Sequence, residues 1–219
     1  MSIQQNLNNI KSSLPKHVTL VAVSKTKPVS DIMEAYQSGQ RIFGENKIQE
    51  MAEKQELMPK DIQWHMIGHV QRNKVKYMAS FVNLIHGVEN YRTLKEINKQ
   101  AKKHNRSIDC LLQIKIASED SKFGMGAHEA SDILQSNEFS ELKNINVIGV
   151  MGMATFTDNQ EQIKEEFTQL KSFFNQLKAL NPRLEVISMG MSGDYTLAIA
   201  CGSTMIRVGS SIFGERNYN

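Results

Sequence analysis

The stretch VTLVAVSKTKP, from Val18 to Pro28, has the pattern of a buried β-strand that ends in charged residues. Successive side chains of a strand alternate between its faces, so Val21, Val23 and Lys25 share one face. Both faces are apolar before the lysine, which is typical of a strand covered on both sides. Pro28 cannot donate to a sheet and disfavours helix at the residue before it, so we expect the strand to end there. Lys25 is therefore predicted at the carboxyl end of a buried strand, where it either reaches a functional site or extends its ammonium into solvent.

Strand patterns and helix patterns alternate along the rest of the chain. Seven more strands are predicted at residues 41–46, 62–68, 81–88, 108–116, 146–153, 184–192 and 203–210. Helices are predicted at residues 2–14, 30–39 (capped by Ser30), 47–58, 70–78, 91–104, 127–137, 160–180 and 195–200. Strict alternation indicates a parallel sheet, and eight units predict one α/β domain over residues 1–219, a (β/α)8 TIM barrel with an extra N-terminal helix. The alternative, a doubly wound open sheet, is disfavoured because no GxGxxG follows the first strand.

The composition is that of an ordinary globular protein, with 40% hydrophobic and 22% charged residues. A net charge of +3 is too small to favour nucleic acid or an anionic membrane as a partner. Cys110 and Cys201 have no CxxC partner, so we expect free thiols in a reducing compartment. No apolar run approaches the ~18 residues of a membrane span. We expect a soluble, cytoplasmic, monomeric protein.

Polar residues recur where the predicted strands end, which is where barrels of this kind build their active sites. The set is Lys25, Glu45, Asn46, His65, Lys122, Ser192, Arg207, Gly209, Ser210 and Ser211. His65 and His69 span a strand end and need not share a face, so no metal site is predicted, and His65 taken alone reads as a satisfied core or rim histidine. The methionines at 151, 153, 189 and 191 are expected to fill the barrel.

Arg207 is the most informative member of this set. It alternates with Ile206 and Val208, so it faces the barrel interior if those two pack against helices. The eighth and first strands are neighbours in a closed barrel, which would place Arg207 beside Lys25. Burial and a like charge would favour the neutral form of Lys25, which can attack a carbonyl to form a Schiff base. The alternative is that Arg207 pairs with a carboxylate such as Glu45 or Glu215.

The loops after the seventh and eighth strands have the residues of a phosphate site. Gly190–Gly193 and Gly209–Ser211 combine glycines, which allow close approach, with serine hydroxyls and a predicted helix N-terminus. A phosphate beside a Schiff-base lysine suggests pyridoxal 5′-phosphate (PLP) as the cofactor, with Arg207 as the partner of the pyridine nitrogen. Because arginine only donates, it would leave that nitrogen unprotonated and weaken the ring as an electron sink.

Several motifs together resemble the YggS/PROSC family of pyridoxal phosphate-binding proteins, also called PLP homeostasis proteins. The matching segments are AVSKTKP (22–28), FGEN (43–46), WHMIGHVQRNK (64–74), SKFGMG (121–126) and GMSGDYTLAIACGSTMIRVGSSIFGER (190–216). The resemblance covers essentially the whole chain and implies a fold like the N-terminal domain of alanine racemase. The sequence departs from the common family pattern at His69 and Arg72. Both are expected on the rim of the loop after the third strand, so they put access to the pocket in question and not cofactor binding.

The resemblance also implies roles for individual residues. The first lysine of SKTKP, Lys25, would carry PLP; Arg207 would face the pyridine nitrogen. The remaining cofactor-binding residues implied are Asn46, His65, Ser192, Gly209 and Ser210. The implied function is to hold PLP in intracellular PLP homeostasis, with transient contact with apo PLP enzymes and no robust catalysis.

Two other functions remain open. The first is a PLP-dependent amino-acid racemase with a single catalytic lysine. It is disfavoured because the racemase takes its opposite acid/base, a tyrosine, from a second domain for which this chain leaves no room; His65 is the one candidate to replace it. The second is an aldolase-type lyase that uses Lys25 on a phosphorylated sugar.

Overall fold

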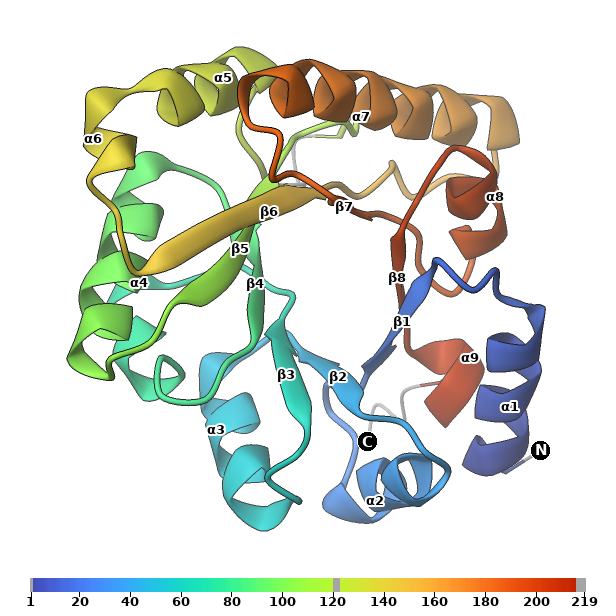
Figure 1. The fold of residues 1–219 in the computed structure, drawn as a ribbon. Helices are drawn as coiled ribbons and strands as arrows, with labels where there is room; N and C mark the ends of the chain where they lie inside the picture. The colour runs from blue at the N-terminus through green and yellow to red at the C-terminus, as the bar shows by residue number, and fades with distance from the viewer. Residues whose placement is uncertain (1, 120–122, 216–219) are drawn as a thin grey trace.

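Eight parallel strands close into a barrel in chain order, from β1 to β8 and back to β1 (Figure 1). This computed structural model describes residues 2–119 and 123–215, so the predicted rim residue Lys122 lies outside the described part. The strands are β1 (Thr19–Val23), β2 (Ile42–Glu45), β3 (Gln63–Met66), β4 (Leu84–Val88), β5 (Ile108–Gln113), β6 (Ile145–Met151), β7 (Val186–Ser188) and β8 (Met205–Val208). The predicted barrel is confirmed.

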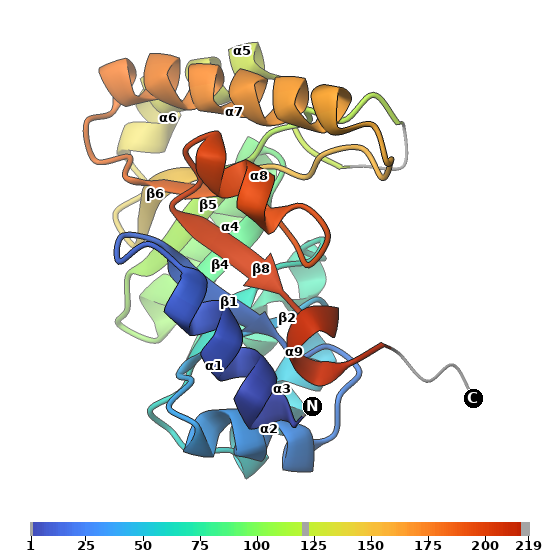
Figure 2. The same cartoon turned by 90° about the vertical axis from the view of Figure 1, so that its right-hand side faces the viewer.

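Helices surround the barrel and one precedes it. They are α1 (Ile3–Ser13), α2 (Val29–Gln37), α3 (Ile48–Leu57), the 3-10 helix η1 (Arg72–Tyr77), α4 (Tyr91–Lys103), α5 (Ala127–Gln135), α6 (Asn137–Ser140), α7 (Gln160–Leu180), α8 (Tyr195–Ala200) and α9 (Ser210–Phe213). The extra helix α1 lies against α2 and α9 (Figure 2). The Asn6 side-chain amide donates to the Ile212 carbonyl over 3.1 Å, which ties α1 to the last helix. Within the described ranges, no helix is long and apolar enough to cross a membrane.

The core has two layers, one inside the barrel and one between the barrel and its helices. The inner layer contains Val21, Leu84, Leu111, Met151 and Met205. Ile206 and Val208 belong to the outer layer, as the alternation along the eighth strand predicts. The prediction for the methionines is partly wrong: Met151 and Met153 pack inside the barrel, but Met189 packs in the outer layer because Ser188 takes the inward position.

The first strand is shorter than predicted. It ends at Val23, and the Lys27 amide then closes a turn on the Ser24 carbonyl at 3.0 Å. Thr26 has φ = 63°, a left-handed conformation that is rare for a β-branched residue and interrupts the extended backbone. Lys25 therefore lies in a turn just beyond the strand.

Three predicted helices also differ in detail. Pro28, not Ser30, is the N-cap residue of α2; its backbone is extended, and Ser30 already lies within the helix. The segment predicted as 127–137 divides into α5 and α6, since the Ser136 side chain accepts from the Phe139 amide and starts a second helix. The segment predicted as 70–78 forms the 3-10 helix η1.

Candidate functional site

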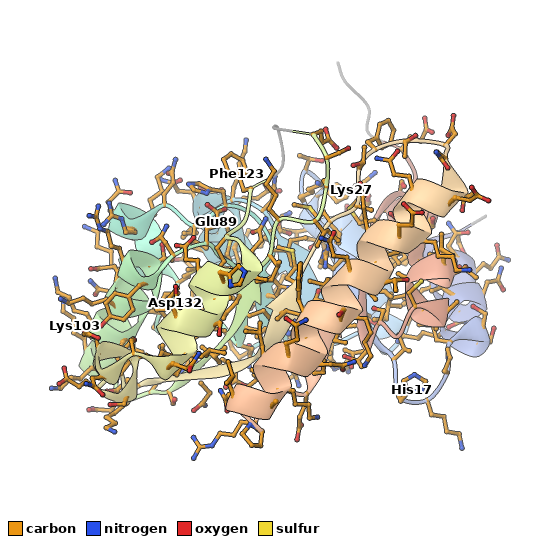
Figure 3. All side chains as sticks on the ribbon, turned by 90° about the horizontal axis from the view of Figure 1, so that it is seen from above. His17, Lys27, Glu89, Lys103, Phe123 and Asp132 are labelled. Atoms are coloured by element: carbon orange, nitrogen blue, oxygen red, sulfur yellow. The ribbon has the colours of Figure 1, made fainter. Side chains whose placement is uncertain are left out.

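Lys25 and Lys27 lie two residues apart but have different surroundings. Lys27 donates from Nζ to the carbonyls of Phe213, Gly214 and Glu215 at 2.9, 3.1 and 3.1 Å, so it caps the carboxyl end of α9. Figure 3 shows Lys27 toward the same end of the barrel as Phe123, away from His17 at the opposite end. The Lys27 ammonium is engaged by three carbonyls, which gives it a structural role. Lys25 is half-buried in the turn that precedes it.

Strands β1 and β8 pair in parallel, as predicted, and their register positions Arg207 relative to Lys25. Val21 lies opposite Arg207, and Lys25 follows Val21 by four residues. A strand rises ~3.3 Å per residue, so Arg207 lies deeper in the barrel than the turn that carries Lys25. The expectation that these two residues would stand side by side is therefore corrected. They lie at two depths on one side of the barrel.

Arg207 is buried inside the barrel, with only 4% of its surface exposed. Its Nη1 donates to the Ser188 carbonyl and hydroxyl at 2.8 and 2.6 Å, and its Nη2 donates to the Gly152 carbonyl at 3.1 Å. Burial lowers the pKa of the guanidinium to about 10, so it remains charged at neutral pH. The predicted alternative of an ion pair with Glu45 does not hold, because Glu45 pairs with Lys54.

The loops after β7 and β8 meet at the Ser192 hydroxyl. The amides of Gly209 and Ser211 both donate to Ser192 Oγ, at 3.2 and 3.5 Å, from the start of α9. Gly190 has φ = 98°, a left-handed conformation that favours glycine. An added Cβ on Gly209 would lie 3.3 Å from the Val23 side chain, so the start of α9 sits against the end of β1. Two amide donors and a hydroxyl thus converge beside the Lys25 turn, with the exposed Ser210 next to them.

Asn46 follows β2 and lies at the same end of the barrel. Its Oδ1 is buried and has no hydrogen-bond partner among the described residues. A Cβ on Gly68 would meet the Asn46 carbonyl at 2.4 Å, and a Cβ on Gly87 would meet the Gly68 carbonyl at 2.3 Å. Glycine at these two positions lets the loops after β2 and β3 and strand β4 approach closely. The orphaned Asn46 oxygen is available to a donor that the protein itself does not supply.

His65 is buried inside the barrel and hydrogen-bonded there, while the cofactor-binding role that the resemblance implies for it stays a prediction. Its Nδ1 lies 3.1 Å from His86 Nε2, and His86 Nδ1 lies 3.0 Å from Ser188 Oγ. Burial lowers the pKa of His65 to about 3 and lowers that of His86 well below its ordinary value, so both rings are neutral at pH 7. We call Arg207, Ser188, His86 and His65 the inner chain.

The sequence prediction missed two members of the inner chain, His86 and Ser188. The available signal was that each is a polar residue in the middle of an apolar strand. Both lie on the inward face, as Leu84 does two residues before His86.

A second polar network lies on the opposite side of the barrel wall, between β2 and α3. Lys54 Nζ donates to the carboxylates of Glu45 and Glu50 at 2.8 and 2.7 Å and to the Ser24 carbonyl at 2.8 Å. The Ser24 hydroxyl donates to Glu45 at 2.6 Å. Burial raises the pKa of Glu45, and the charge of Lys54 opposes that rise. We call Ser24, Glu45, Glu50 and Lys54 the outer cluster.

The two unusual residues of the third loop lie at its exposed edge. His69 Nδ1 contacts the Glu89 carboxylate at 3.0 Å, and its ring lies 5.1 Å from that of Phe123. Arg72 begins η1 and is exposed. Within the described residues, no group of three or more His, Cys, Asp or Glu side chains could hold a metal ion.

Comparison with known proteins identifies the family. The model of the alanine racemase N-terminal domain matches residues 1–217. Pyridoxal phosphate homeostasis proteins are similar over most or all of their length: that of Pasteurella multocida (strain Pm70) is 38% identical over 100% of both chains, and that of Escherichia coli (strain K12) is 37% identical over 94% of this chain and 88% of its own. The chain belongs to the pyridoxal phosphate homeostasis proteins.

Solved structures agree with this family and its fold. PipY of Synechococcus elongatus PCC7942 with PLP bound is 34% identical and covers 97% of this chain and 100% of its own, at a TM-score of 0.89. The form of PipY without PLP gives a TM-score of 0.92 over the same shares. An alanine racemase of Clostridium difficile 630 shares the fold at a TM-score of 0.81 and 16% identity; this chain spans 61% of it. The predicted racemase-like barrel is thus confirmed.

Proposed function

We propose that this protein binds PLP at the carboxyl end of the barrel, holds it as a Schiff base on Lys25, and takes part in intracellular PLP homeostasis. The observation that carries the proposal is the convergence of the Gly209 and Ser211 amides on Ser192 Oγ beside the Lys25 turn. An oxygen already occupies the focus of two amide donors, which is the arrangement that binds a phosphate oxygen. The names of the full-length relatives, and the PLP in the PipY structure, support the same ligand.

The other site residues fit the cofactor in their chemistry. Asn46 Oδ1 is a buried acceptor without a partner, and Arg207 presents a permanent donor deeper in the barrel. Bound PLP would supply an aldehyde for the lysine and a ring that can withdraw electrons. A charged arginine at the pyridine nitrogen would keep that nitrogen unprotonated, which suits holding the cofactor more than using it for catalysis.

We infer that the protein has no robust catalytic activity of its own. A racemase needs a second acid or base near the substrate, and His65 was the sequence candidate. His65 is buried, its Nδ1 is bonded to His86, and its pKa of about 3 makes it a poor proton carrier at neutral pH. The names of the relatives refer to homeostasis and not to an enzyme.

The further elements of this proposal concern the setting in which the protein works. We propose that residues 1–219 act as one PLP-binding domain, monomeric and in transient contact with apo PLP enzymes. Cys110 and Cys201 are both free, which is in keeping with a reducing cytoplasm.

The visible absorbance of the purified protein after addition of PLP tests the proposal. We expect a new band that borohydride bleaches in the wild type and in Lys27→Ala, and no such band in Lys25→Ala. A wild-type protein without the band would overturn PLP binding, and a band that survives Lys25→Ala would assign the attachment to another lysine. Turnover of any member of an amino-acid panel, dependent on Lys25, would overturn the non-catalytic role.

A further inference from the structure

The inner chain crosses the barrel interior instead of following its wall. Its members come from β3, β4, β7 and β8, and the link from His86 to Ser188 joins strands that are not neighbours in the sheet. The three contacts along it measure 2.6, 3.0 and 3.1 Å. All four residues have at most 4% of their surface exposed, so the chain is shielded from water.

The chemistry of its members gives the inner chain a direction. A guanidinium can only donate, so Ser188 Oγ accepts from Arg207. The remaining described contact of that hydroxyl is His86 Nδ1, which receives its hydrogen. His86 then carries its own hydrogen on Nε2 and donates it to His65 Nδ1, so His65 is also protonated at Nε2. Every donor thus points from Arg207 toward His65.

This direction holds only while both imidazoles are neutral. A protonated His86 would present an N–H to the Ser188 hydroxyl, which would have to turn its hydrogen away from the ring and beside the Arg207 charge. The charged group that faces His86 is Arg207, and His65 packs against His86 at 5.2 Å between ring centres. Both neighbours disfavour a charge on His86, which keeps the Ser188 oxygen free to accept from Arg207.

We propose that Ser188 and His86 are positioning residues, which with His65 hold the Arg207 guanidinium in one orientation toward the ring of bound PLP. The inference rests on the proposed function, since it assigns Arg207 to the cofactor. Ser188 engages Nη1 through two oxygens and the Gly152 carbonyl engages Nη2, so the guanidinium plane is set by β7 and by the residue that follows β6. His86 in turn sets the direction of the Ser188 hydroxyl.

Paired variants test this role in the full-length protein with PLP. We expect Ser188→Ala and His86→Leu to weaken PLP binding roughly tenfold and to shift the pH midpoint of the absorbance of bound PLP. Ser188→Thr keeps the hydroxyl, and His86→Gln keeps one acceptor and one donor, so both should restore the wild-type pH profile. Ser203→Ala is the matched control, because the Ser203 hydroxyl is buried near β7 and β8 and its contacts among the described residues are all backbone carbonyls.

The outcomes separate this proposal from the proposed function. A wild-type protein that fails to bind PLP overturns the function itself. Normal binding and an unchanged pH profile in Ser188→Ala and His86→Leu overturn the positioning role alone, as does an equal shift in Ser203→Ala. Should the variants not fold, the imidazole ¹⁵N shifts of the wild-type protein without PLP decide: we expect hydrogen on Nε2 of both His65 and His86, and hydrogen on Nδ1 would refute the direction.

Discussion

The inner chain and the outer cluster are two buried polar networks on opposite sides of the barrel wall. They differ in how each accommodates a buried charge. The outer cluster places one cation between two acidic side chains, so each acid has the lysine as a direct partner. The inner chain has one cation, no carboxylate among its members, and two histidines kept neutral. The outer cluster therefore holds its cation without a ligand, although Glu45 Oε2 is buried with no hydrogen-bond partner among the described residues. A network with a fixed cation and directed donors is suited to hold a ligand.

Two other lysines, Lys54 and Lys27, have structural roles near Lys25. The ammonium of Lys54 is hydrogen-bonded within the outer cluster, and that of Lys27 is hydrogen-bonded to three carbonyls at the end of α9. The outer cluster also holds the turn that carries Lys25, since Lys54 donates to the Ser24 carbonyl and Glu50 accepts from the Thr26 amide at 2.6 Å. These contacts sit on either side of Lys25 and hold the strained backbone at Thr26 in place.

The most severe test of the outer cluster removes its cation. Lys54→Met leaves the buried Glu45 carboxylate without a counter-charge, and we expect it to lower the free energy of unfolding by about 3–5 kcal/mol. Urea denaturation measures this effect. In a Glu45→Gln background the same change should cost clearly less, because no buried charge is then left alone. An equal cost in both backgrounds would mean that the packing of the lysine stem, and not the ion pair, stabilises this wall.

The buried histidines of the inner chain should make the stability of the protein depend on pH. His65 has a folded pKa of about 3, below the ordinary 6.5, so between these values the unfolded state binds more protons than the folded state. Stability should therefore fall as pH falls from 6.5 toward 3, by about 1.4 kcal/mol per pH unit for each buried neutral histidine. His86→Leu should make this slope shallower in urea titrations at several pH values. Leu84→Ala, a cavity variant of the same strand face, should lower stability at every pH and keep the slope.

The contribution of Glu45 to stability should depend on pH in the opposite direction to that of the histidines. Burial raises its folded pKa, so the folded state binds its proton more tightly than the unfolded state does. The stability that this carboxyl contributes is complete below pH 4.5 and is lost as pH rises through the raised pKa. The stability of the wild type relative to Glu45→Gln should decline over that range. A relative stability that rises with pH would show that Lys54 outweighs burial at this site.

Glu50→Gln should have the smallest effect of the series. The Glu50 side chain is 22% exposed, so water replaces part of its interaction with Lys54. We expect a loss of about 1 kcal/mol or less in urea denaturation. A loss as large as that of Lys54→Met would make Glu50, and not Glu45, the principal partner of the lysine.

Much of the fold was predictable because it depends on local pattern. The alternation of strands and helices gives the number of units, and the two-residue period of β8 correctly assigns Arg207 to the inside. Closure of the barrel then correctly places β8 beside β1. These inferences need only the alternation of side chains along each strand and the order of the strands.

The parts that could not be predicted depend on distances between remote segments. Ser188 and His86 are 102 residues apart and meet only because the barrel has a definite width. Lys27 differs from Lys25 through carbonyls about 186 residues further along the chain. The left-handed Thr26 is contrary to its own propensity and is held by Glu50 from α3. The alternation of side chains along a strand does not reveal these contacts. For this reason the depth of Arg207 and the end of β1 were predicted wrongly.

The seam between β1 and β8 has a consequence for when the protein can first capture its ligand. Lys25 is made early in synthesis, whereas Arg207 and Gly209 are made roughly 180 residues later, which takes a ribosome on the order of 10–40 s. Until β8 docks beside β1, the nascent chain has the lysine but neither the amide donors of α9 nor the buried guanidinium. Under the proposed function, retention of PLP requires the finished barrel, and it would serve as a readout that the last strand has docked.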